Sequence, residues 1–165
     1  SNTIPLVDWN EQYHSNHGAI QEAYHVFIKS GLSLFQNTSL SILEIGFGTG
    51  LNSLITFIEA KKLTLDVFYT GVEAYPITSK ELEQLNYISE LGAENFQEEF
   101  LKMHDCPWEE KVLLDNTFTL CKQQKDFINI DDENMFNLVY FDAFGARVQP
   151  ELWTEDIFKK MYKAL

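Results

Sequence analysis

The chain has 165 residues, a hydrophobic content of 45% and a formal charge of −13, from 12 Lys and Arg against 25 Asp and Glu. This length fits one domain of ordinary size with a real core, and no apolar run reaches the ~18 residues of a membrane-spanning helix. The charge argues against a broad phosphate-binding surface, because counterion release requires clustered cations, and the first residues lack the basic and apolar segments of a signal peptide.

The predicted elements alternate between helices and strands along the chain. Gly31 follows the first helix at the usual C′ position, Lys61 suits the negative end of the second, and Thr78 to Glu81 has the capping-box form that opens a third. Strands separated by helices imply a parallel sheet with helices on both faces. The expected helices are 19–30, 50–61, a helix from 78, 92–104 and 154–165, and the expected strands are 41–45, 66–73, a hairpin within 111–122, and 136–143.

We expect one domain over residues 1–165, with a helical leader over 1–40 and a Rossmann-like core over 41–165. The chain stops in or just after a helix with no strand to follow it, which is unusual for a doubly wound domain. We therefore expect the core to lack its last strands and the chain to be a piece of a longer protein.

A glycine-rich loop joins the first predicted strand to the helix that follows it. Its sequence is Glu44-Ile45-Gly46-Phe47-Gly48-Thr49-Gly50. Glycine tolerates positive φ and lets a ligand approach the backbone closely. A dinucleotide site requires GxGxxG, but here the third glycine comes one residue early and Leu51 stands where that pattern has Gly or Ala. The (E/D)xGxGxG pattern resembles motif I of class I S-adenosylmethionine-dependent methyltransferases, and the absence of GKS or GKT excludes a Walker A loop.

Acidic residues stand near the ends of three predicted strands: Glu44, Glu73 and Asp142. Ligands of open α/β sheets bind outside these carboxyl ends. Glu73 is placed to accept hydrogen bonds from both ribose hydroxyls of a nucleoside cofactor. The alternative is a plain tight turn with an exposed glutamate beside it.

The loop supplies most of the expected cofactor contacts. Glu44 either binds near the methionine amino group or caps its own loop, and both can hold together. Thr49 and Asn52 either contact the methionine carboxylate or serve as helix-start residues. The expected cofactor-binding residues here are Glu44, Gly46, Phe47, Gly48, Thr49, Gly50, Asn52 and Glu73.

Four sequence blocks carry a more specific resemblance. They lie, in order, at 13–28, 44–52, 72–78 and 140–158. Together they resemble the MnmC methyltransferase family, including its stand-alone members. The resemblance implies a class I Rossmann-like fold, S-adenosyl-L-methionine as cofactor, and methylation of 5-aminomethyl-(2-thio)uridine to 5-methylaminomethyl-(2-thio)uridine at the tRNA wobble position. It also implies a cytoplasmic protein with two partners, the tRNA anticodon loop and a separate FAD-dependent oxidase.

The chain departs from the family pattern at two places. Many relatives have Ala-Pro after the D-G/A-F unit, whereas here Gly145 and Ala146 follow it, which implies a more flexible loop. Many relatives also carry Gly-Asp after the third strand, where the aspartate accepts from the adenine amino group. Here Asp126 is the candidate for that position.

The resemblance also suggests residues for catalysis and substrate binding. Methyl transfer requires a neutral amine, and Asp142 can hold the protons of that amine and accept charge as the ammonium forms. Phe144 either stacks on the uracil or fills the core, and Arg147 either grips a phosphate or pairs with a surface acid. Tyr13 and Glu22 belong to a leader that can fold over the cofactor, although Glu22 also suits a solvated helix face.

The remaining observations concern metals and competing functions. His14 and His17 have ligand-like spacing, but no acid or cysteine cluster joins them, so no metal is expected. Cys106 and Cys121 lack metal-binding spacing and are expected to be reduced thiols. The acidic charge favours a methyltransferase of the same fold that acts on a small molecule or protein. A non-catalytic S-adenosylmethionine-binding module is a further alternative, and an NAD oxidoreductase is disfavoured by GxGxG.

Overall fold

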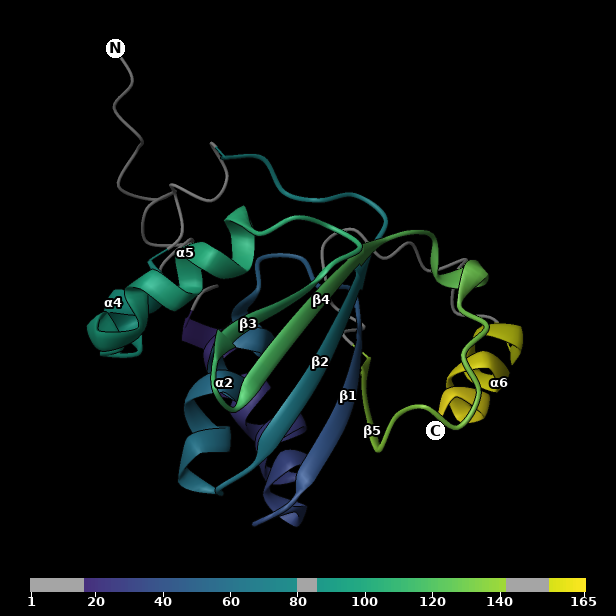
Figure 1. Cartoon of the computed structure of the whole chain (residues 1–165), viewed down its shortest axis with the longest axis horizontal. Helices are drawn as coiled ribbons and strands as arrows, with labels where there is room; N and C mark the ends of the chain where they lie inside the picture. The colour runs from purple at the N-terminus through teal and green to yellow at the C-terminus, as the bar shows by residue number, and fades with distance from the viewer. Residues whose placement is uncertain (1–16, 80–85, 142–154) are drawn as a thin grey trace.

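A computed structural model describes residues 17–79, 86–141 and 155–165 of the chain. Its centre is a five-stranded sheet in the order β3-β4-β2-β1-β5 (Figure 1). Strands β1, β2, β4 and β5 run parallel, and β3 pairs antiparallel with β4. The strands are β1 (Ser39–Ile45), β2 (Asp66–Glu73), β3 (Lys111–Asp115), β4 (Phe118–Gln124) and β5 (Leu138–Phe141).

Helices lie on both faces of the sheet, as the sequence predicts (Figure 1). The first helix is α-helical over residues 17–23 and continues as the π-helix η1. The helical elements are η1 (Tyr24–Lys29), η2 (Leu32–Leu34), α2 (Leu51–Lys62), α4 (Tyr87–Glu90), η3 (Glu94–Phe96), α5 (Gln97–Asp105), η4 (Phe127–Asn129) and α6 (Glu155–Ala164).

The alternation of side chains along the strands builds a separate core on each face. On one face, Ile42 of β1 packs in a cluster with Leu54 of α2 and Met103 of α5. On the other face, Leu43 packs in a second cluster with Met161 of α6. β1 therefore separates two helical layers, which explains why its residues Ile42–Ile45 are all buried.

The carboxyl ends of the three neighbouring parallel strands β2, β1 and β5 meet at one edge of the sheet. Ile45 pairs with Val72 on one side and with Phe141 on the other. This is the edge at which open α/β sheets bind ligands. Asp142, the expected acid at the tip of β5, lies outside the described residues, as does Ala143, the last residue of the strand predicted over 136–143.

Most predicted elements are confirmed, including a hairpin turn after Asp115, and α5 ends just before Pro107 as expected. The position of Gly31 after the first helix is confirmed, and its φ of −130° lies outside the left-handed region that glycine often adopts at this position. Of the helix predicted from Thr78, Ser79 is helical and residues 80–85 lie outside the described part. Within the described ranges, no helix has the length and apolar character needed to cross a membrane.

Gly31 is required by a close contact. A Cβ at this position would lie 2.7 Å from the carbonyl oxygen of Phe27 and 3.3 Å from Cδ1 of Leu138. We predict that Gly31→Ala lowers stability by about 1–3 kcal/mol, because neither the backbone oxygen nor the packed strand can yield freely.

Gly18→Ala is the matched control, since a Cβ at Gly18 would meet nothing within 4 Å. This helical position should be neutral or gain about 0.5–1 kcal/mol. Urea denaturation of both variants measures the difference. Equal stability of the two alanine variants would contradict the proposed contact at Gly31.

Candidate functional site

The glycine loop between β1 and α2 has a backbone that only glycine adopts easily. Gly46, Gly48 and Gly50 have φ values of 88°, 52° and 80°. All three lie in the left-handed region, where a Cβ is disfavoured. The three glycines therefore stand at the alternate positions where the loop backbone adopts the left-handed conformation.

The end of β2 fixes this loop from one side. The carbonyl oxygen of Val72 accepts hydrogen bonds from the backbone N–H groups of Gly46 at 2.9 Å and Phe47 at 3.1 Å. The Glu73 carboxylate accepts from the N–H of Gly48 at 2.7 Å and from the N–H of Tyr75 at 3.1 Å. Glu73 is only 3% exposed, so these charge-assisted bonds lie in a shielded place.

Glu44 lies fully buried beneath the loop. Its two carboxylate oxygens accept from the Tyr69 hydroxyl and from the Asn52 side-chain amide, each at 2.7 Å. Nearby, the hydroxyls of Thr56 and Tyr140 are 3.1 Å apart, and burial raises the pKa of Tyr140. Asn52, at the start of α2, thus ties the helix to the acid of β1.

Phe47 faces inward and fills a gap in β2. It is 4% exposed, and a Cβ on Gly71 would lie 2.5 Å from its ring. The absence of a side chain at Gly71 therefore lets the loop lie down on the sheet. The edge of the Phe47 ring faces His104 of α5, with ring centroids 6.1 Å apart.

His104 of α5 also holds the loop. Its Nε2 lies 2.8 Å from the carbonyl oxygen of Thr49. A carbonyl only accepts, so Nε2 carries the hydrogen and donates it. The pKa of His104 is lowered to about 4, chiefly by burial, with the nearby Lys122 charge adding to the effect against the Thr49 bond. His104 is therefore neutral near pH 7, with its hydrogen on Nε2.

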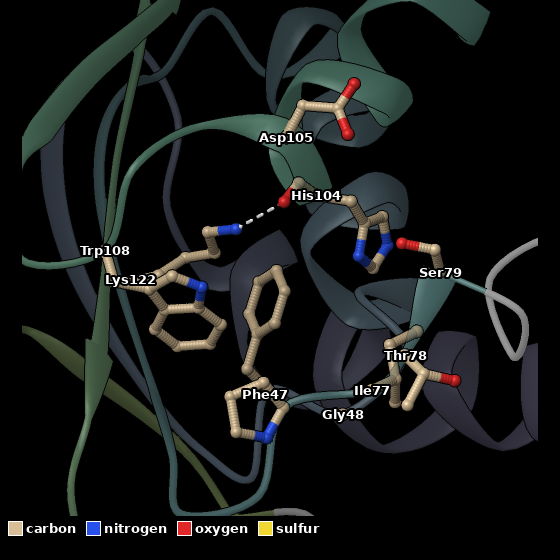
Figure 2. A pocket seen from close by; sticks show the side chains of 10 residues that line it. Phe47, Gly48, Ile77, Thr78, Ser79, His104, Asp105, Trp108 and Lys122 are labelled. Carbon is tan, nitrogen blue, oxygen red and sulfur yellow. Dashed lines mark hydrogen bonds between the residues drawn. The ribbon is translucent and has the colours of Figure 1, made fainter.

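A cavity of about 90 Å³ opens beside the loop, and Figure 2 shows its lining side chains. Lys122 of β4 borders it and is 1% exposed. Its ammonium donates to the His104 carbonyl oxygen at 2.9 Å and lies 4.6 Å from the centroid of the Trp108 ring. Burial lowers the pKa of Lys122. This volume is smaller than the ~300–1,000 Å³ that is usual for small-molecule pockets, so the cavity is too small to enclose a whole nucleoside cofactor.

The structure brings the loop residues, Glu44 and Glu73 together, but it leaves other predicted site residues apart or undescribed. Asp126 follows β4, and its carboxylate accepts from the N–H of Ile128 as the N-cap of η4. Glu22 is exposed on the first helix. The predicted residues outside the described ranges are Tyr13, Asp142, Phe144 and Arg147.

Sequence reasoning missed the side chains that approach the loop from other elements. These are Tyr69, His104 and Lys122. Alternation along β2 and β4 gives a partial signal, because Tyr69 lies two residues before Gly71, and Lys122 pairs with Gly71 across the sheet. Nothing local in the sequence points to His104.

The residues fit an S-adenosylmethionine-type cofactor in the chemistry of their donors and acceptors. The glycine loop and the first N–H groups of α2 offer donors to a carboxylate. Glu73 retains lone pairs for ribose hydroxyls while it holds the loop. Across the described residues, no group of three His, Cys, Asp or Glu side chains is arranged to hold a metal ion.

Comparison with known proteins identifies a family for this chain. A protein family described as S-adenosyl-L-methionine-dependent methyltransferase matches residues 83–165, half of the chain, and the chain belongs to that family. The sheet and helix arrangement is accordingly that of a class I, Rossmann-like methyltransferase, and the cofactor is S-adenosyl-L-methionine.

The more specific resemblance to MnmC is also confirmed. The tRNA 5-methylaminomethyl-2-thiouridine biosynthesis bifunctional protein MnmC of Campylobacter fetus is 25% identical over 94% of this chain and 26% of that protein. The protein of the same name from Aliivibrio fischeri is 26% identical over 98% of this chain and 27% of its own length. The crystal structure of MNMC2 from Aquifex aeolicus aligns over 88% of this chain and 42% of that one, with 20% identity and a TM-score of 0.48. The chain thus spans about a quarter of the length of the curated relatives.

The buried His104 makes stability depend on pH. The folded state keeps this ring neutral down to a pKa of about 4, while the unfolded chain protonates it below about 6.5. Its contribution is therefore complete above about pH 6.5 and is lost as the pH falls toward 4. We predict a loss of about 2 kcal/mol between roughly pH 7 and pH 5 from this residue.

Urea denaturation of the wild type and His104→Gln at these two pH values measures the effect. The variant should be less stable near pH 7 but should show a shallower decline. Identical pH slopes for the two proteins would contradict a neutral, buried His104.

Proposed function

We propose that this protein transfers the methyl group of S-adenosylmethionine to the amine of 5-aminomethyl-(2-thio)uridine at the wobble position of tRNA. The observation that carries the proposal is the glycine loop, held by Glu73 at the carboxyl edge of the sheet, in a chain whose curated relatives are named for biosynthesis of this nucleoside. Such a substrate also implies a cytoplasmic protein. The resemblance to the MnmC family further implies a separate FAD-dependent oxidase as a partner.

The cofactor is assigned to the loop and to the acids around it. Glu73 accepts from the ribose hydroxyls, and the N–H groups at the start of α2 donate to the methionine carboxylate. Glu44, Asn52 and Thr49 shape the methionine end, and Asp126, on the segment after β4, accepts from the adenine amino group. The cofactor supplies an electrophilic methyl group, so the protein's task is to align the amine with it.

Asp142 is proposed to hold the substrate amine. It follows Phe141 directly, and Phe141 pairs with Ile45 at the base of the glycine loop. A carboxylate at this edge accepts hydrogen bonds from the amine and stabilises the ammonium that forms. We assign Phe144 to stacking on the uracil and Arg147 to binding a phosphate. Tyr13 and Glu22, in the N-terminal leader, are assigned to substrate binding.

The formal charge of −13 favours a second candidate. A nucleic-acid enzyme usually presents a basic face. A methyltransferase that acts on a small molecule or a protein needs no such face. The two candidates share the cofactor site and differ only in the methyl acceptor.

The predicted role of Glu73 is tested with Glu73→Gln. The amide keeps one acceptor oxygen but loses the charge, so the Kd for S-adenosylmethionine should rise on the order of tenfold. Glu110→Gln is the matched control, because Glu110 is exposed in the turn before β3. Calorimetric titration measures both. An unchanged Kd in Glu73→Gln would remove this residue from the cofactor site.

The substrate is tested with tRNA that carries 5-aminomethyl-uridine. Incubation of the protein with this tRNA and S-adenosylmethionine, followed by nucleoside mass spectrometry, should show the gain of one methyl group. Asp142→Asn should lower turnover by roughly 100-fold or more while the cofactor Kd changes by less than about threefold. Cofactor binding without methylation of this tRNA would favour the second candidate, and full turnover in Asp142→Asn would refute its assigned role.

A further inference from the structure

Lys122 of β4 is a buried lysine whose ammonium lies next to the end of α5, and its burial needs an explanation. Lys122 is 1% exposed, and none of the described carboxylates forms an ion pair with it. Removing an ammonium from water without a counter-ion is costly. Its neighbours are the carbonyl oxygen of His104, the Trp108 ring and the Cys106 thiol, and the negative charge of Asp105 offsets part of the effect of burial on its pKa.

The end of α5 provides the compensation. The last carbonyl groups of a helix lack intrahelical donors and form the negative end of the helix dipole. His104 is the penultimate residue of α5, and its carbonyl oxygen accepts from the Lys122 ammonium at 2.9 Å. Lys122 therefore fastens the end of α5 to β4.

The same residue, His104, continues this connection to the glycine loop. Its side chain donates to the Thr49 carbonyl at 2.8 Å. Its ring meets Phe100 edge-on at 5.0 Å, and a Cβ on Gly50 would lie 3.0 Å from its Nε2. The ring is thus enclosed, and only a glycine at position 50 leaves room for its hydrogen bond.

The two hydrogen bonds between the loop backbone and the side chains of Glu73 and His104 involve consecutive loop residues. Glu73 holds the N–H of Gly48, and His104 holds the carbonyl of Thr49. Glycines have more accessible backbone conformations than other residues, so a free loop would lose much entropy when it closes on a ligand. The hydrogen bonds to Glu73 and His104 restrict the loop already in the folded protein, so less entropy is lost when a ligand binds. This effect is called preorganisation.

We propose that His104 and Lys122 are positioning residues for the cofactor loop. His104 fixes the peptide between Thr49 and Gly50, and Lys122 fixes His104 by holding the end of α5. This inference rests on the proposed cofactor site, but the loop-holding role can be measured without cofactor.

The first experiment separates the hydrogen bond from packing. His104→Phe keeps a ring of similar shape but loses the donor, whereas His104→Gln keeps an N–H. We expect the Kd for S-adenosylmethionine to rise on the order of tenfold in His104→Phe and by less than about threefold in His104→Gln, with kcat at saturating cofactor little changed in either. An unchanged Kd in His104→Phe, or equal losses in both variants, would overturn the positioning role of His104.

The second experiment tests whether Lys122 acts through His104. Lys122→Met retains a long side chain without the charge. If Lys122 acts on the loop only through the His104 side chain, Lys122→Met combined with His104→Phe should raise the Kd no more than the larger single change. Additive losses in the double variant would overturn the link between Lys122 and the loop.

The third experiment needs no ligand. The Gly50 N–H bonds to the Phe47 carbonyl inside the loop at 3.0 Å. Its hydrogen exchange should be at least several-fold faster in His104→Phe than in the wild type or His104→Gln. Equal exchange rates would overturn the proposal. Faster exchange in a protein that does not bind S-adenosylmethionine would support loop positioning and would count against the proposed function alone.

Discussion

The site depends on one interaction, the hydrogen bond from the Gly48 N–H to the Glu73 carboxylate. It joins the first βα loop to the end of the neighbouring strand. The loop contains glycines at alternate positions, and all three have a left-handed backbone conformation. A segment so rich in glycine has many competing conformations. Because Glu73 is buried, its charge is poorly screened and selects one of them. The acid thus both shapes the loop and remains available to accept from a ligand.

Other parts of the fold support this interaction by bringing polar groups beneath and beside the loop. Glu44 is paired with neutral donors from β2 and α2, so its burial leaves neither oxygen without a partner. Phe47 lies in the gap that Gly71 leaves open. The loop is therefore fixed by contacts to several elements, as expected for a site that orients a reactive cofactor. The formal charge of −13 bears on the choice between the two proposed methyl acceptors.

Local sequence was sufficient to predict most of the helices and strands. β2, Asp66–Glu73, has the bounds predicted for the second strand, and the loop glycines have the positive φ that glycine tolerates. Gly31 follows the first helix as predicted, but the need for glycine there comes from the Phe27 carbonyl oxygen and from the Leu138 side chain, which is far away in the sequence. His104 and Lys122 were missed for a similar reason, since their contacts to the loop exist only after α5 packs on the sheet.

The central claim is that the three-glycine loop binds an S-adenosylmethionine-type cofactor. Its most direct test is an amide chemical-shift titration of the protein with S-adenosylhomocysteine, the stable demethylated form of the cofactor. The account predicts large, saturable shifts for Gly46, Gly48 and Gly50, with little change at Gly18 and Gly92, which belong to other elements. Saturable binding that leaves the three loop glycines unshifted, or no binding at millimolar ligand, would contradict it.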